Sequence, residues 1–325
     1  MSRRNAWRMA SVVLALLATI YFLTYVWRYA DDFSKLDWHT GDGLLLGAAT
    51  LIWVGVIGFG AAIWKMLLGS LGHPRGWLDC LTIYALAQFG KYLPGNVGHH
   101  VGRVIMASRV GVPAVVTLQT QVIEMAWAIG VAAGVALLGL WLLLGDVPGP
   151  GGIATNGLLL LALVAGALLL PRGTLWLAQT LLPRKFARIS GGAVLSPPGN
   201  RVMVAVGLLY LLTFLMVGLL LDLLARYGFD AANSHVLMLT TIFAWSWIAG
   251  YLSPGAPAGL GVREAVMVSM LTPIYGGGTA VGLGLALRVV TTLGDGLAFL
   301  LGLAARRFLR AHYPAAKHAD PEIKL

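Results

Sequence analysis

The sequence predicts an all-α polytopic membrane protein with about six full transmembrane helices and two re-entrant helical hairpins in an inverted-topology repeat. Three observations predict this fold: an apolar composition, two proline-glycine breaks at matching positions, and Lys and Arg gathered at the ends of apolar runs. Of 325 residues, 58% are hydrophobic and only 11% are charged, and the mean hydropathy is +0.80. A soluble domain must cover its exterior with polar groups, so this composition indicates a membrane protein.

Six apolar runs have the roughly 20 residues that a helix needs to cross a bilayer. They cover about 9–27, 43–64, 113–144, 153–171, 202–224 and 279–304. The first run follows Arg3, Arg4 and Arg8 and is longer than the apolar core of a usual signal peptide. We therefore expect it to be retained as the first membrane helix.

Two proline-glycine breaks interrupt apolar stretches in the two halves of the chain. The first lies in Tyr92-Leu93-Pro94-Gly95 and the second in Tyr251-Leu252-Ser253-Pro254-Gly255, with their prolines 160 residues apart. Backbone that leaves the helix at membrane depth is tolerated only where it is buried in protein or lines a cavity. Broken helices at corresponding positions of two halves are typical of a transport site built on an internal repeat.

The distribution of Lys and Arg predicts the orientation. Basic residues lie near the N-terminus, in the segments 65–109 and 172–201, and again at 306–310. The positive-inside rule then places both termini in the cytoplasm. We expect the membrane to be the inner membrane of a bacterium. In this orientation the segments 76–111 and 233–275 fit as hairpins that enter from the cytoplasmic and the outer side.

An alternative is that 232–251 and 262–274 are two ordinary spans. The second of these segments is short for a span and is followed by Gly276-Gly277-Gly278, which favours the hairpin. We therefore predict a first membrane repeat at 1–150, a second at 151–305, and a basic cytoplasmic tail at 306–325 that is disordered.

Charged residues inside the apolar frame are costly, at about 2.5–3.5 kcal/mol each at the membrane centre on insertion scales. Glu124, Arg288 and Asp295 lie within predicted spans. One interpretation assigns them to substrate binding or transport. The other treats them as buried ion pairs that fix the packing of the helices.

Residues around the two breaks are the candidate substrate-binding site. Lys91, Arg103 and Arg263 would form a cationic lining for an anionic headgroup, and helix N-termini after Gly95 and Gly259 would add backbone N–H donors. An alternative is that the two arginines only mark the membrane interface. The predicted site consists of Lys91, Tyr92, Pro94, Gly95, Arg103, Tyr251, Pro254, Gly255, Gly259, Arg263 and Glu264.

Common enzyme motifs are missing from the sequence. It contains no H-E-x-x-H, G-x-S-x-G or Walker A motif. The adjacent His99 and His100 are unsuitably spaced for one metal, and the single Cys80 excludes an intramolecular disulfide. The net charge is +10, and the Lys and Arg residues lie in short clusters at the ends of apolar runs. This distribution indicates attraction to anionic lipid headgroups rather than to nucleic acid. We expect no enzymatic activity, no cofactor and no metal.

Two motifs carry a resemblance to a known family. Lys91-Tyr92-Leu93-Pro94-Gly95 with Gly98 and Arg103, and Gly259-Leu260-Gly261-Val262-Arg263-Glu264 after Pro254, resemble the lysylphosphatidylglycerol synthase transmembrane region family. The resemblance covers most of residues 10–305. The chain departs from it at Ala256-Pro257-Ala258, where the family usually has Pro-Gly-Gly.

The resemblance implies a flippase-like integral membrane protein that moves lipid. Larger proteins with this region carry a soluble aminoacyltransferase domain, for which we expect no room here, so we do not expect the synthase activity. The expected substrate is an anionic phospholipid or a lipid-linked glycan, and membrane lipids are the expected partners. Two alternatives remain open: a non-catalytic partner of a glycosyltransferase or lipid-modifying enzyme, and an ion-coupled small-solute transporter that uses Glu124 and Asp295.

Overall fold

The computed structural model describes residues 40–92, 97–144, 197–231, 234–253 and 257–312, together with positions 24, 27 and 180. The predicted spans at 9–27 and 153–171 therefore lie almost entirely outside the described residues. The loop tips at 93–96 and 254–256, and the tail from residue 313, also lie outside them.

All of the described secondary structure is helical, and four of the helices are long and apolar enough to cross a membrane. They are α3 (Thr40–Ser70), α6 (Ala114–Leu144), α9 (Asn200–Gly228) and α12 (Gly277–His312). These helices confirm the predicted α-helical polytopic membrane protein. Most of their ends extend past the predicted runs, because an apolar run measures only the hydrocarbon core, whereas a helix can continue into the headgroup region.

Two pairs of shorter helices complete the described bundle. The first pair is α4 (Trp77–Gln88) and α5 (Gly98–Ser108), joined through the 3-10 turn η1 (Phe89–Tyr92). The second is α10 (Val236–Leu252) and α11 (Val262–Tyr275), joined through η2 (Pro257–Gly259). At 1.5 Å per residue, the 14 residues of α11 are too few to cross a hydrocarbon core of about 30 Å. The hairpin prediction is therefore favoured over two ordinary spans.

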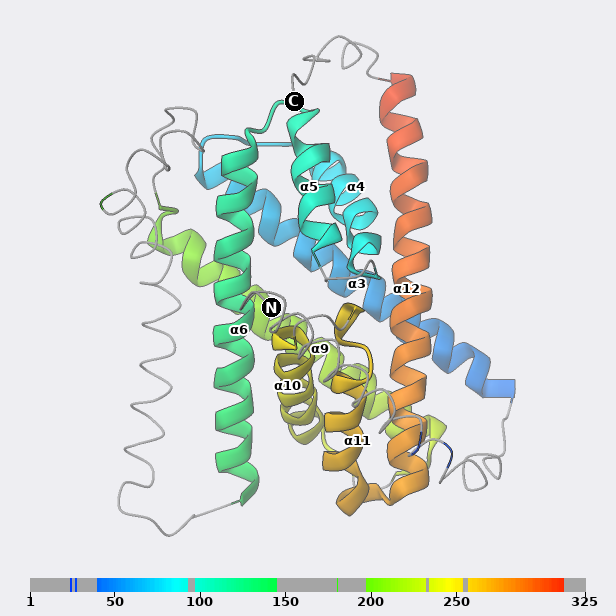
Figure 1. Ribbon diagram of the computed structural model, residues 1–325. Coiled ribbons are helices and arrows are strands. Elements are labelled where there is room, and N and C mark those ends of the chain that lie inside the picture. The colour runs from blue at the N-terminus through cyan, green and yellow to red at the C-terminus, as the bar shows by residue number, and fades with distance from the viewer. Residues whose placement is uncertain are drawn as a thin grey trace, which may run out of the picture.

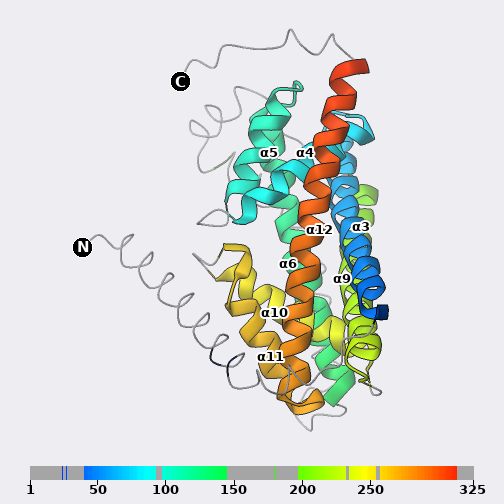
Figure 2. The same cartoon turned by 90° about the vertical axis from the view of Figure 1, so that its right-hand side faces the viewer.

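The two hairpins enter the bundle from opposite ends. In Figures 1 and 2, α4 and α5 lie in the upper half and α10 and α11 in the lower half, with their connected ends directed toward the middle. The turns η1 and η2 contact each other there. The long helices α6 and α12 flank the hairpins and run in opposite directions (Figure 1).

Helix contacts in one half have counterparts in the other half. Hairpin helix α4 packs on α12 and α3, and the corresponding α10 packs on α6 and α9. Likewise α5 packs on α6, and α11 packs on α12. Helices α3 and α9, which correspond to each other, pack together. The described helices are thus arranged with two-fold pseudosymmetry.

Glycine pairs bring the two arms of each hairpin together. A Cβ atom on Gly90 would lie 2.6 Å from the carbonyl carbon of Gly98, and one on Gly259 would lie 3.1 Å from the Cα atom of Gly250. Gly259 also has a φ of +69°, a conformation that L side chains rarely adopt. Both hairpin tips therefore require a side chain no larger than hydrogen at the crossing point.

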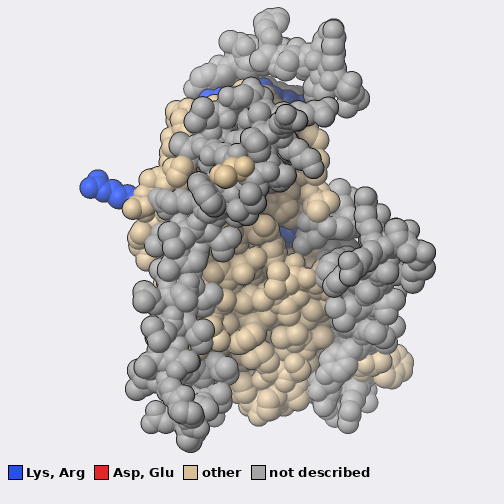
Figure 3. Space-filling model, turned by 60° about the vertical axis from the view of Figure 1, so that its left-hand side comes forward, with Lys and Arg blue, Asp and Glu red and all other residues tan. Residues whose placement is uncertain are grey.

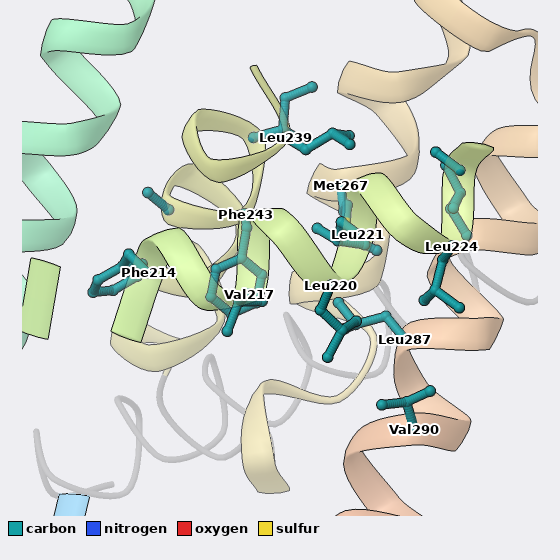
Figure 4. Packing of buried hydrophobic residues seen from close by; sticks show 14 of the residues in the cluster. Phe214, Val217, Leu220, Leu221, Leu224, Leu239, Phe243, Met267, Leu287 and Val290 are labelled. Atoms are coloured by element: carbon teal, nitrogen blue, oxygen red, sulfur yellow. The ribbon is translucent and has the colours of Figure 1, made fainter. Parts of the chain in front are cut away.

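The interior of the bundle is packed from apolar side chains of helices far apart in the sequence. Figure 4 shows the face of α9 that meets α10, α11 and α12. Lipid tails are as apolar as leucine, so close packing rather than exclusion from water holds such helices together. Small residues permit the close approach: a Cβ on Gly218 of α9 would lie 1.8 Å from Thr240 Oγ1 of α10. The residues labelled in Figure 4 are Phe214, Val217, Leu220, Leu221, Leu224, Leu239, Phe243, Met267, Leu287 and Val290.

The outer surface is suited to lipid. Large apolar side chains such as Leu208, Leu300 and Leu44 are more than half exposed. The described part of the face in Figure 3 is largely uncharged, with Lys and Arg confined to the top, one projecting side chain and a small central area. A broad uncharged surface of this kind marks contact with a membrane.

A buried charge in α9 closes the turn before α10. Asp222, which the sequence analysis did not single out, is 5% exposed and pairs with Arg226 one turn later at 2.9 Å. The Ser234 hydroxyl donates to the other carboxylate oxygen of Asp222 at 2.5 Å, and Arg226 donates to the Ser234 carbonyl. These contacts hold the connection to the second hairpin, so Asp222 has a structural role.

The hairpin tips should tolerate no side chain at Gly90. Gly90→Ala places a methyl group against backbone, so the first hairpin must shift, at a cost of about 1–3 kcal/mol for overpacking. Gly55→Ala in α3 is the matched control, because a Cβ there meets nothing within 4 Å. The measurement is the apparent melting temperature of the purified protein in detergent. Equal melting temperatures for the two variants would contradict the close crossing.

Candidate functional site

A cavity of about 240 Å³ lies where the two hairpins meet. Its wall takes residues from all four long helices, from the helices of both hairpins and from both 3-10 turns, so both halves of the chain contribute. Ionisable side chains project into it although the surrounding bundle is apolar. The charged residues of the wall are Lys91, Arg103, Glu124, Arg263, Arg288 and Asp295.

Most of the predicted site residues come together at this cavity. Its lining includes Lys91, Tyr92, Arg103, Tyr251, Gly259 and Arg263, and all three predicted intramembrane charges, Glu124, Arg288 and Asp295. Glu264 is not part of the lining and is only 2% exposed, but it contacts two lining arginines. The remaining predicted residues, Pro94, Gly95, Pro254 and Gly255, lie outside the described residues.

The first hairpin contributes a closely paired arginine. Arg103 of α5 donates from Nη1 to both carboxylate oxygens of Glu124 on α6, each at 2.7 Å, and both residues are 5% exposed. The guanidinium carbon also lies 4.7 Å from the centre of the Tyr84 ring. A charge-assisted pair at this distance, with a cation–π contact beside it, leaves Arg103 neutralised by the protein itself.

Asp295 of α12 holds the turn η1 of the first hairpin. Lys91 Nζ lies 2.7 Å from its Oδ2 atom, and the Tyr92 hydroxyl donates to the same oxygen at 2.5 Å. Trp53 of α3 donates from Nε1 to Oδ1 at 3.1 Å. This carboxylate therefore ties three elements together, which supports the structural interpretation of Asp295 that the sequence left open.

The second hairpin carries a looser cluster. Glu264 of α11 accepts the backbone N–H of Gly261 at 2.8 Å, so its Oε2 atom caps the helix to which it belongs. Its Oε1 atom lies 3.6 Å from Arg263 Nε and 3.4 Å from Arg288 Nη1. Charge-assisted hydrogen bonds are usually about 2.7–2.9 Å long, so two guanidinium groups share this carboxylate without a good hydrogen bond from either.

Apart from Tyr92 and Tyr251, the aromatic and histidine side chains of the cavity wall were not assigned to the site by the sequence analysis. Tyr251 stacks on Trp247, with ring centroids 4.8 Å apart. His99 and His100 lie side by side with centroids 3.9 Å apart, and His100 Nδ1 pairs with Gln121 Oε1 at 3.1 Å. The spacing of Trp247 and Tyr251 is a usable signal, since residues four apart share a helical face. Other lining residues of this kind are Trp53, Tyr84, Tyr210 and Phe214.

The Arg103–Glu124 pair should be required for a stable fold. Arg103→Ala leaves a carboxylate buried without its partner, which typically costs 3–5 kcal/mol. The double variant Arg103→Met with Glu124→Leu removes both charges, so it should melt at a higher temperature than Arg103→Ala. Thermal melting in detergent compares them, with Arg109→Ala at an exposed position as the control. If the double variant is no more stable than the single one, the pair is not the cause of the loss.

Comparison with known protein families identifies the family of this chain. The model of the lysylphosphatidylglycerol synthase TM region matches residues 4–298, which is nearly the whole chain and includes both hairpins and the cavity. No curated protein matches the chain. The family prediction made from the two break motifs is therefore confirmed, and with it a link to lipid handling in the membrane. The chain belongs to the lysylphosphatidylglycerol synthase transmembrane region family.

Proposed function

We propose that the protein moves an anionic phospholipid or a lipid-linked glycan between the leaflets of the bacterial inner membrane, without changing it chemically. One observation carries the proposal: a cavity lined by both halves of the chain and by charged side chains lies where two oppositely directed hairpins meet. Charges are costly at such a depth in a membrane, so their concentration around a cavity supports a binding site for a polar group.

The proposed path separates the two parts of a lipid. The headgroup enters the cavity between the hairpins, while the acyl chains stay in the bilayer beside the uncharged outer surface. Family membership supports a lipid over a water-soluble solute. The residues of the two breaks that line this proposed path are Lys91, Tyr92 and Arg103 from the first hairpin and Tyr251 and Arg263 from the second.

The proposed exchange between leaflets uses the pseudosymmetry of the bundle. We assign the two membrane repeats to residues 1–150 and 151–305, as the sequence predicts, and the matching helix contacts of the two halves support this division. In inverted repeats, rocking one unit against the other opens a central site alternately to the two sides. We assign the cytoplasmic side to the open end of the first hairpin and to both termini, and the distribution of basic segments supports this orientation.

Transport should depend on an unobstructed cavity. Thr213 of α9 lines the cavity, and its hydroxyl is occupied by the Leu209 carbonyl of its own helix. Thr213→Trp should therefore block the space by volume, without breaking a contact between helices. In vesicles with a fluorescent phosphatidylglycerol in both leaflets, dithionite quenches only the outer label unless lipid crosses. In vesicles with the wild-type protein, dithionite should quench most of the label. Thr213→Trp should slow this quenching several-fold.

The neighbouring Leu212→Trp is the matched control. Leu212 belongs to the same helix, is 39% exposed and is not part of the cavity lining. Leu212→Trp adds the same indole group, so the label in its vesicles should be quenched as fast as in wild-type vesicles. Quenching by the wild type that stays at the level of protein-free vesicles would refute lipid translocation. Equal slowing by both variants would show that the cavity is not the path.

A further inference from the structure

We propose that Arg263 and Arg288 form the anion subsite of the cavity, and that it takes a lipid headgroup with a single phosphodiester and no ammonium group. This inference rests on the proposed function, because it names the class of lipid and the part of the site that recognises its charge. The evidence for it is a difference between the two halves of the chain in the residue that faces the hairpin arginine.

The hairpin arginines of the two halves have different neighbours on the long helices. Arg103 in the first half faces a carboxylate, Glu124 of α6, and forms two short bonds with it. The long helix of the second half presents Arg288 at nearly the corresponding place, since α6 and α12 start at 114 and 277. Arg263 therefore faces a second cation where its counterpart faces an anion.

Glu264 cannot neutralise both arginines. One of its oxygens already accepts the Gly261 N–H, and the other lies 3.4 Å and 3.6 Å from the two guanidinium groups. Arg263 Nε and Arg288 Nη2 find no hydrogen-bond partner among the described residues. Arg263 is only 8% exposed, so an unused donor there costs free energy until a ligand accepts it. Phosphate oxygens match the planar fork of arginine donors.

The charge of the described site indicates how much negative charge the ligand carries. Lys91 and Arg103 are balanced by Asp295 and Glu124, whereas Arg263 and Arg288 share the single carboxylate of Glu264. One positive charge is left over, which one phosphodiester neutralises. A headgroup with an added ammonium would need a free carboxylate, but Asp295 and Glu124 are occupied by Lys91 and Arg103. Phosphatidylglycerol-like headgroups therefore fit better than zwitterionic ones.

Binding to the purified full-length protein in detergent tests this proposal. Soluble dihexanoyl-phosphatidylglycerol, dihexanoyl-phosphatidylcholine and inorganic phosphate are titrated separately, with native mass spectrometry or thermal shift as the readout. Loss of a charge-assisted hydrogen bond weakens binding by about tenfold or more, so Arg288→Gln and Arg263→Gln should each weaken phosphatidylglycerol binding by that amount. Arg288→Lys, which keeps the charge but not the fork, should fall between Arg288→Gln and the wild type.

Two further variants make the test specific. Arg109→Gln removes an exposed arginine outside the cavity and should bind like the wild type. Glu264→Gln removes the competing negative charge but keeps an oxygen for the Gly261 N–H, so it should tighten phosphatidylglycerol binding. Weaker binding by Glu264→Gln, or unchanged binding by both arginine variants in folded protein, would overturn the subsite.

The three titrated ligands distinguish an anionic lipid from other sources of phosphate. The vesicle assay distinguishes failure of the proposed subsite from failure of the proposed function. Phosphatidylcholine or free phosphate binding as tightly as phosphatidylglycerol would overturn the assignment to an anionic lipid. If phosphatidylglycerol binds through Arg288 but no lipid crosses the vesicle membrane, the subsite stands and translocation fails. If lipid crosses at the wild-type rate in Arg263→Gln and Arg288→Gln, translocation stands and the subsite fails.

Discussion

The requirement that every backbone polar group be satisfied inside a bilayer determines most of this structure. A helix satisfies its own groups, but a chain that turns at mid-membrane leaves some of them open. Such turns persist only within protein, and the described 3-10 turns of both hairpins, η1 and η2, contact each other within the bundle. The helices α6 and α12 flank that meeting point, and the tilted α3 and α9 cross behind it in the view of Figure 1. The position of the cavity thus follows from the same constraint that allows the chain to turn.

The charged residues at the cavity form two groups. One group holds the bundle together, and the other has hydrogen-bonding capacity that the described residues leave unused. The contacts of Glu124 and Asp295 connect hairpin to long helix and leave their carboxylates well satisfied. The Arg263–Arg288–Glu264 cluster has long contacts and unused donors. The two interpretations of intramembrane charge left open by the sequence therefore both apply, each to a different set of charged residues. A buried ion pair and a binding residue differ here in how completely the protein satisfies them, not in residue type.

Sequence alone was sufficient for the helical membrane fold, the hairpins and most of the charged cavity lining, because apolar length, proline-glycine breaks and isolated charges are local signals. It could not show which charges pair, since Lys91 and Asp295 are 204 residues apart and meet only through packing. It also missed Gly90 and Gly250, although each lies four residues before a break proline, because a glycine in an apolar helix has many possible uses. Asp222 was missed because its partners, Arg226 and Ser234, lie at the end of the span rather than near a break.

The unequal arginine neighbours of the two hairpins have a further consequence for energetics. Two identical inverted repeats would give inward-facing and outward-facing forms of equal free energy, because each form would be the other rotated. Arg288 opposite Arg263, where Glu124 stands opposite Arg103, removes this degeneracy. In the proposed exchange between leaflets, repulsion between like charges would act on the contacts of only one half, and the empty protein would then have a preferred resting side. An anion that relieved this repulsion would reduce the preference, so binding itself would bias the proposed conformational equilibrium.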